Sequence, residues 1–177
     1  MTDMQAQPAV VPDFGDDDET DRKLVIICSK GNLDMAYPGL VLANSALGEG
    51  IEVDLFFTFW GFDMITKSRQ KKLSFTPVGN TAMHLPVGGR MPQWLSPFPG
   101  MTWVATRMMR KQIDDLGVPP VDEFLDQIVA SGGRLWACRM SADMQKLTMD
   151  DLRDDVEDII TAADFMDLSE GAQTLFI

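Results

Sequence analysis

The sequence predicts one α/β domain, built on a flavodoxin-like, doubly wound sheet of about five mostly parallel strands flanked by helices. Residues 23–28 form a short apolar run rich in β-branched residues, which is typical of a strand buried on both faces of a parallel sheet. A helical pattern and a second strand-like run at residues 52–57 complete a βαβ unit of about 35 residues. Strand-like and helical patterns alternate again before the C-terminus. Together these observations favour a doubly wound sheet of mostly parallel strands.

The first βαβ unit has clear boundaries. Residues 29–32 form a turn, and apolar residues at helical spacing predict a helix that starts near Leu33 and ends at Gly48. Pro38 is then expected near the first turn of this helix, where a missing N–H is tolerated. The second strand runs on into residues 58–61.

The pattern loosens over residues 67–117. This stretch is rich in proline and glycine, with a helix resuming at about residues 104–116. An irregular insert of this length in a small domain usually serves a function or an interface. We therefore expect it to cover a pocket or to form a subunit contact, with His84 and Trp94 as pocket or lid residues, against the alternative that it fills the core.

Regular patterns return after Pro119 and Pro120. Gly132 and Gly133 separate the first predicted helix from the strand that follows it. The expected elements are an amphipathic helix at 121–129, a strand at 134–138, a short helix capped by Ser141 and reaching about residue 146, a helix over 159–168, and a closing strand at 173–177.

Charge is distributed unevenly along the chain. The 177 residues carry a net charge of −12, and residues 1–21 hold seven acidic residues and no basic one. We interpret residues 1–22 as a disordered acidic tail and residues 23–177 as the folded domain. The remainder is only mildly acidic, which argues against nucleic acid as a partner. Basic residues beside apolar ones near residue 110 leave a membrane-surface role as a lesser option.

The N-terminus is acidic and lacks the apolar region of a signal peptide, and no apolar run reaches the ~18 residues of a spanning helix. The two cysteines are therefore expected to be free thiols in a reducing cytoplasm.

Both cysteines are expected at the carboxyl edge of the sheet, where sites of open α/β folds lie. Cys138 ends a predicted strand just before a helix start, and Arg139 follows it. A helix N-terminus and a neighbouring cation both lower the pKa of a thiol, and the thiolate is the reactive form. The alternative is that Cys138 is an inert core residue. Cys28 is a possible second thiol, provided that the two strands are neighbours.

Other polar residues carry weaker signals. With one histidine and two distant cysteines, no metal site is expected. Residues 29–32, Ser-Lys-Gly-Asn, lack the full glycine fingerprint of a nucleotide-binding loop, so we interpret them as a turn with some anion affinity.

Four segments resemble the DsrE/DsrF-like sulfur-relay family, in its larger, insert-bearing branch. They are residues 25–34, 54–61, 135–143 and 172–177, of which Phe-Phe-Thr-Phe-Trp-Gly and Ala-Cys-x-Met-Ser are the most specific. The resemblance implies cytoplasmic proteins that are often homo-oligomeric and that exchange sulfur with TusA-like carriers or rhodaneses. It also implies that the cysteine matching Cys138 receives sulfur as a persulfide.

The sequence thus predicts a sulfur carrier or sulfurtransferase that holds sulfane sulfur on Cys138, with Arg139 and Ser141 in support and no cofactor. Whether it counts as an enzyme stays open. Two alternatives remain: a non-catalytic oligomeric ligand-binding module, and a dithiol redox protein that uses Cys28 and Cys138.

Overall fold

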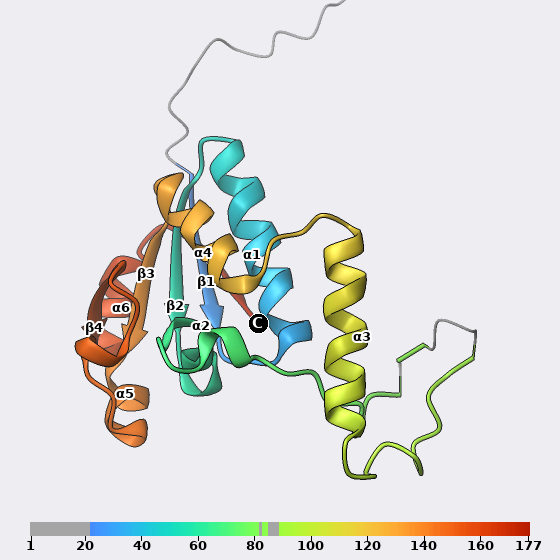
Figure 1. Ribbon diagram of the computed structural model, residues 1–177. Coiled ribbons are helices and arrows are strands. Elements are labelled where there is room, and N and C mark those ends of the chain that lie inside the picture. Colours follow the sequence, from blue (N-terminus) through green and yellow to red (C-terminus); the bar gives the residue numbers. More distant parts are fainter. Residues whose placement is uncertain (1–21, 82, 85–88) are drawn as a thin grey trace, which may run out of the picture.

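The structure is a computed structural model that describes residues 22–81, 83–84 and 89–177 (Figure 1). Five strands form one parallel sheet in the order β4-β3-β2-β1-β5, which confirms the predicted α/β class. The strands are β1 (Lys23–Cys28), β2 (Glu52–Phe57), β3 (Arg134–Cys138), β4 (Val156–Ile160) and β5 (Gln173–Phe176). Of the acidic tail predicted over residues 1–22, only Arg22 is among the described residues.

The strand order explains how the helices divide between the two faces of the sheet. The helices are α1 (Leu33–Gly48), α2 (Phe62–Ile65), α3 (Met101–Asp115), α4 (Val121–Ala130), α5 (Arg139–Gln145) and α6 (Ala162–Leu168). From β1 to β4 the chain steps in one direction, and from β4 it returns to the other side of β1. Because parallel crossovers are right-handed, the return step places α6 on the face opposite α1 and α4.

Alternating strand residues serve these two layers. Leu55 pairs with Ile26, and both are fully buried towards α1, whose Gly39 lies over Ile26. Phe56 points the other way and packs against Phe165 of α6, with ring centroids 4.4 Å apart. This alternation fixes which strand residues can meet at the carboxyl edge.

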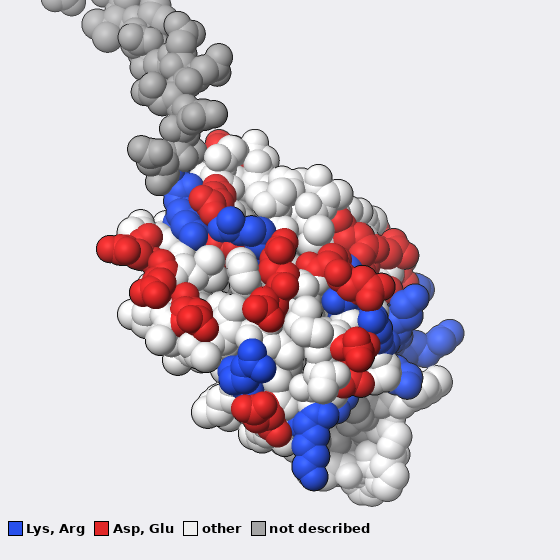
Figure 2. All heavy atoms as spheres, turned by 90° about the vertical axis from the view of Figure 1, so that its left-hand side faces the viewer, with Lys and Arg blue, Asp and Glu red and all other residues white. Residues whose placement is uncertain are grey.

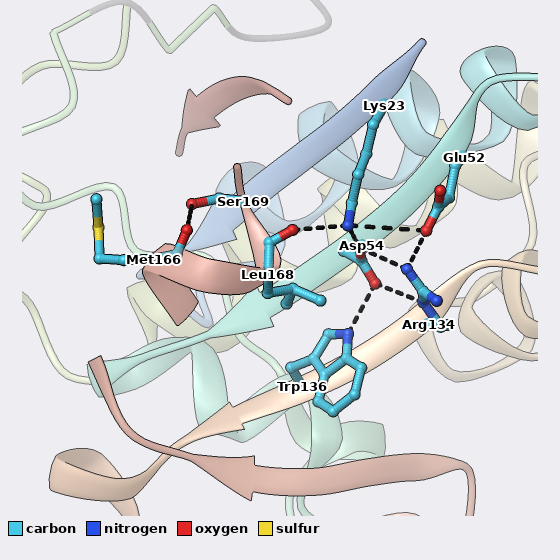
Figure 3. Close-up of polar contacts among 8 residues, drawn as sticks. All are labelled: Lys23, Glu52, Asp54, Arg134, Trp136, Met166, Leu168 and Ser169. Carbon is cyan, nitrogen blue, oxygen red and sulfur yellow. Dashed lines mark hydrogen bonds and ion pairs between the residues drawn. The ribbon is translucent and has the colours of Figure 1, made fainter. Parts of the chain in front are cut away.

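A buried carboxylate fastens the sheet to α6 (Figure 3). Asp54 is fully buried, and it accepts hydrogen bonds from Arg134 Nε at 2.8 Å and Trp136 Nε1 at 2.7 Å. Lys23 Nζ lies 3.1 Å from the same carboxylate and donates to Leu168 O at 2.6 Å. Burial alone would raise the pKa of Asp54, but the hydrogen bonds from these three residues outweigh it and hold the pKa below its usual value.

Three sequence-based boundaries differ from the structure, two of them towards the C-terminus. Residues 156–160, whose last two members we assigned to a helix, form β4; Thr161 and Asp164 make a capping box that starts α6 only at Ala162. The helix expected from Ser141 begins at Arg139 with Cys138 as its N-cap, so Ser141 lies in the first turn.

The third difference concerns α3, which begins at Met101, three residues before its expected start. Pro38 lies inside α1, close to its first turn, where it removes one backbone donor near the helix start.

Acidic and basic side chains are interspersed on the face that carries β4 and α6 (Figure 2). The drawn part of this face therefore shows no continuous basic stripe. Among the described residues, no helix has both the length and the apolarity needed to cross a membrane.

Candidate functional site

The carboxyl ends of β1, β2 and β3 lie side by side and bring the candidate residues to one edge of the sheet. The last residues of these strands are Cys28, Phe57 and Cys138. In the paired register Cys28 lies beside Phe57, and Phe57 lies beside Ala137. The two cysteines therefore share an edge, with β2 between them.

Cys138 lies where β3 turns into α5. It is the N-cap residue of this helix, has extended backbone angles (φ −76°, ψ 123°), and is 9% exposed. Its side chain makes no capping hydrogen bond. Cys138 is thus a buried residue at the edge of the core, in a position set by the strand end and by the helix that follows.

Ser141 anchors α5 to the end of β2. Its fully buried hydroxyl accepts a hydrogen bond from Phe59 N–H at 2.8 Å and shares another with Thr58 Oγ1 at 3.1 Å. Gln145 Nε2 of the same helix donates to Phe59 O at 2.7 Å. These bonds hold Phe59 in a left-handed conformation (φ 46°), which is strained for a non-glycine residue. The supporting role expected for Ser141 therefore takes the form of positioning the helix that starts after Cys138.

Arg139 is directed elsewhere. Its Nη2 donates to Ile159 O at 2.6 Å near the end of β4. Hydrogen bonds from the Thr161 backbone and side chain hold the pKa of Asp164 below its usual value, and the charge of Arg139 adds to this effect. Within the described residues, no hydrogen bond joins this guanidinium to the Cys138 sulfur. Arg139 thus ties α5 to β4, in addition to bringing positive charge to the helix start.

Cys28 is sealed in the core. It is 4% exposed, and its sulfur lies 3.6 Å from the place that a Cβ on Gly39 of α1 would occupy. Burial raises the pKa of the Cys28 thiol to about 12, so it stays protonated at neutral pH.

The structure does not support a dithiol site. Strands β1 and β3 are not neighbours, and two strand spacings amount to about 9.5 Å, beyond the Cα separation of a disulfide. Alternation also turns the two side chains to opposite faces, because Cys28 shares its face with Ala137 rather than with Cys138. The condition on which the redox alternative rested, neighbouring strands, is not met.

His84 and Trp94, which we expected in a pocket or lid, belong to the stretch between β2 and α3. This stretch runs beside α3, on the side of the molecule away from α5 (Figure 1). His84 is exposed and lines a cavity with Asp34 and Met108, whereas Trp94 is 72% exposed and contacts Phe98. Within one chain they are therefore not brought to Cys138. Residues 85–88 lie outside the described residues.

A second feature of this edge is a cavity. A cavity of about 530 Å³ opens beside the 29–32 turn, and Arg69 and Lys72 are among its lining residues. The anion affinity expected for that turn and the basic stretch at residues 67–72 both appear in the sequence, but no local pattern indicates that these segments, about 40 residues apart, lie side by side. Among the described residues, no cluster of His, Cys, Asp or Glu could hold a metal ion.

Comparisons with known proteins agree with this architecture. Residues 20–176 match the family described as DsrE/DsrF/DrsH-like. The chain is 34% identical to the sulfur carrier protein DsrE2 of Allochromatium vinosum over 160 residues, which cover 88% of this chain and 98% of that protein. It is 27% identical to the uncharacterized protein YrkE of Bacillus subtilis, over 90% of this chain and 99% of that protein.

Two solved structures share the fold. Protein MTH1491 from Methanobacterium thermoautotrophicum, of unknown function, superimposes with a TM-score of 0.53 at 8% identity, covering 89% of this chain and all of that one. The E. coli ychN protein gives a TM-score of 0.52 at 13% identity, over 88% and 99% of the two chains.

Proposed function

The chain belongs to the DsrE/DsrF/DrsH-like family, and from this premise we propose that it is a cytoplasmic sulfur carrier that holds sulfane sulfur as a persulfide on Cys138. Its similarity to a sulfur carrier protein along nearly the whole chain supports a sulfur-relay role. The observation that supports the assignment to this residue is the position of Cys138 at the end of β3 and the start of α5; both cysteines are buried, but Cys138 is 9% exposed against 4% for Cys28.

The reaction is an exchange in two steps with no net oxidation. The Cys138 thiolate attacks the outer sulfur of a donor persulfide, R–S–S⁻; the donor S–S bond breaks, and the donor leaves as the thiolate R–S⁻. A new S–S bond joins Cys138 to the transferred sulfur. An acceptor thiolate then attacks that outer sulfur and restores the Cys138 thiolate.

The geometry suits such an exchange because the reactive atom of a persulfide lies beyond the cysteine sulfur. An S–S bond places the outer sulfur about 2.0 Å beyond the sulfur of Cys138, a buried residue that is 9% exposed. A partner cysteine needs to reach only that outer atom. We propose a TusA-like carrier or a rhodanese as the class of partner, and a homo-oligomer as the working form.

The low exposure of Cys138 also favours a second candidate, in which this thiol is a packing residue of a non-catalytic ligand-binding module. The two candidates differ in one measurable property, since a carrier must bind sulfur at this position and a packing residue does not.

Mass spectrometry of the protein after incubation with a persulfide donor tests the proposal. We expect the wild type and Cys28→Ala to gain the mass of one sulfur atom, and Cys138→Ser to gain none. Treatment with a reducing thiol should remove the added mass. An adduct that persists in Cys138→Ser would overturn the assignment.

A further inference from the structure

The cavity at the carboxyl ends of β1 and β2 has the size and position of a ligand site. Its volume is about 530 Å³, and its walls come from the β1–α1 turn, from residues after β2 and from residues 68–74. Small-molecule sites commonly enclose roughly 300–1,000 Å³. In open α/β sheets they lie outside the carboxyl ends of the strands. Cys138 is not among the residues that line this cavity.

The lining is polar and carries a surplus of positive charge. Its charged members are Arg69, Lys72 and Asp63. Arg69 Nη1 donates to Asp63 Oδ1 at 3.1 Å and to Gln145 Oε1 at 2.5 Å, so the guanidinium is held in place while its other donors have no partner among the described residues. Lys72 makes no ion pair within the described part of the chain, whereas the adjacent Lys71 faces Asp122 at 3.6 Å.

A glycine in the β1–α1 turn lets two backbone segments meet at the cavity wall. A Cβ on Gly31 would lie 2.4 Å from Trp60 O and 2.8 Å from Asp63 Cβ, so no larger residue fits there. Asn32 and Trp60, which is 61% exposed, are also among the lining residues. Residues of these types can offer neutral donors and a ring surface beside the two cations.

The cavity is linked to the helix that begins after Cys138. Gln145, the last residue of α5, accepts a hydrogen bond from Arg69 at 2.5 Å and donates one to Phe59 O at 2.7 Å. Whatever engages Arg69 is therefore connected to α5 through a single side chain.

We propose that this cavity binds a small molecule that bears a doubly charged tetrahedral oxyanion, held by Lys72 and by the free donors of Arg69. Two sources carry this chemistry: a sulfur oxyanion such as thiosulfate, and a phosphate group. The site is separate from the sulfur on Cys138 and does not depend on the proposed sulfur transfer.

A ¹H–¹⁵N NMR titration of the full chain tests the proposal. Sodium thiosulfate or sodium phosphate is added while sodium chloride keeps the ionic strength constant. We expect saturable shifts of the Gly31 and Asn32 amides with at least one of the two anions, and the tighter anion identifies the source. Shifts that fail to saturate, or that map to the exposed face of α3 instead, would overturn the proposal.

Two neighbouring lysines provide a matched pair of variants. Lys72→Gln should weaken binding about tenfold, because one charged contact is lost. Lys71→Gln removes the same charge one residue away and should leave affinity within about twofold, as expected for a screened surface charge. Equal losses in both variants would contradict a specific site and indicate a general charge effect.

Cys138→Ser separates this inference from the sulfur-carrier proposal. The variant should bind the anion as the wild type does, whatever its behaviour with a persulfide donor. Loss of binding in Cys138→Ser would show that the cavity and the thiol form one site, which contradicts the separation proposed here.

Discussion

The two thiols should differ widely in reactivity, and single-thiol variants measure the difference. Cys138→Ser leaves only Cys28, and Cys28→Ala leaves only Cys138. Burial raises the pKa of Cys28 from 9.0 to about 12. At neutral pH this lowers its thiolate population about a thousandfold relative to an ordinary cysteine. Alkylation requires the thiolate, so its rate should fall by at least that factor.

The assay is iodoacetamide labelling near neutral pH, followed by intact-mass spectrometry. Cys138→Ser should remain unlabelled in the time that consumes a free thiol, while Cys28→Ala should label about a hundredfold faster or more. Both variants should label equally in concentrated urea, which controls for the presence of the thiol. If Cys28→Ala labels as slowly as Cys138→Ser, Cys138 is an inert core thiol and the sulfur-carrier assignment fails.

Three further predictions concern the scaffold. Asp54→Asn removes the buried charge shared by two basic side chains and should lower the free energy of unfolding, measured in urea, by about 2–4 kcal/mol. Glu52→Gln changes a half-exposed residue of the same cluster and should lower it by less than about 1 kcal/mol. Equal losses in the two variants would contradict the reasoning. Because the pKa of Asp54 is held below its usual value, the stability that this carboxylate contributes is present above about pH 4 and is lost as the pH falls further. The free energy of unfolding should therefore fall less steeply with acid in Asp54→Asn than in the wild type, and an unchanged slope would count against this. Gly61→Ala would place a Cβ 2.1 Å from a carbonyl oxygen at the end of β1 and should destabilise the fold by about 1–3 kcal/mol. Gly48→Ala, whose Cβ would have no atom within 4 Å, should not destabilise it. Calorimetric melting of both variants measures the difference.

Much of the fold could be predicted because local patterns and burial agree in most elements. The apolar runs of β1 and β2 and the apolar spacing of α4 each matched the observed element closely. The strand β4 was missed because its centre, Glu157-Asp158, is charged and exposed, as an edge strand permits. Its apolar residues, Val156, Ile159 and Ile160, are divided by this charged pair, and the last two precede a helix almost directly.

The candidate site was less predictable because it depends on which strands are neighbours. Sequence position placed both cysteines at strand ends, which the structure bears out. Nothing in the sequence indicated that β2 would separate them, or that the buried Ser141 would bond to Phe59 some 80 residues earlier. Contacts of this kind arise from topology, and a single sequence carries no local signal for them.

The register between β2 and β3 accounts for the different environments of the two thiols. Phe57 lies beside both Cys28 and Ala137, and all three point into the layer formed with α1 and α4. Ala137 is fully buried there, and Cys28 has its thiol pKa raised in the same layer. Cys138 follows one residue later, so alternation turns it to the opposite face just as the strand gives way to α5. A cysteine at position 137 would share the environment of Cys28, whereas the one-residue step at the strand end places Cys138 on the opposite face, where β3 gives way to α5.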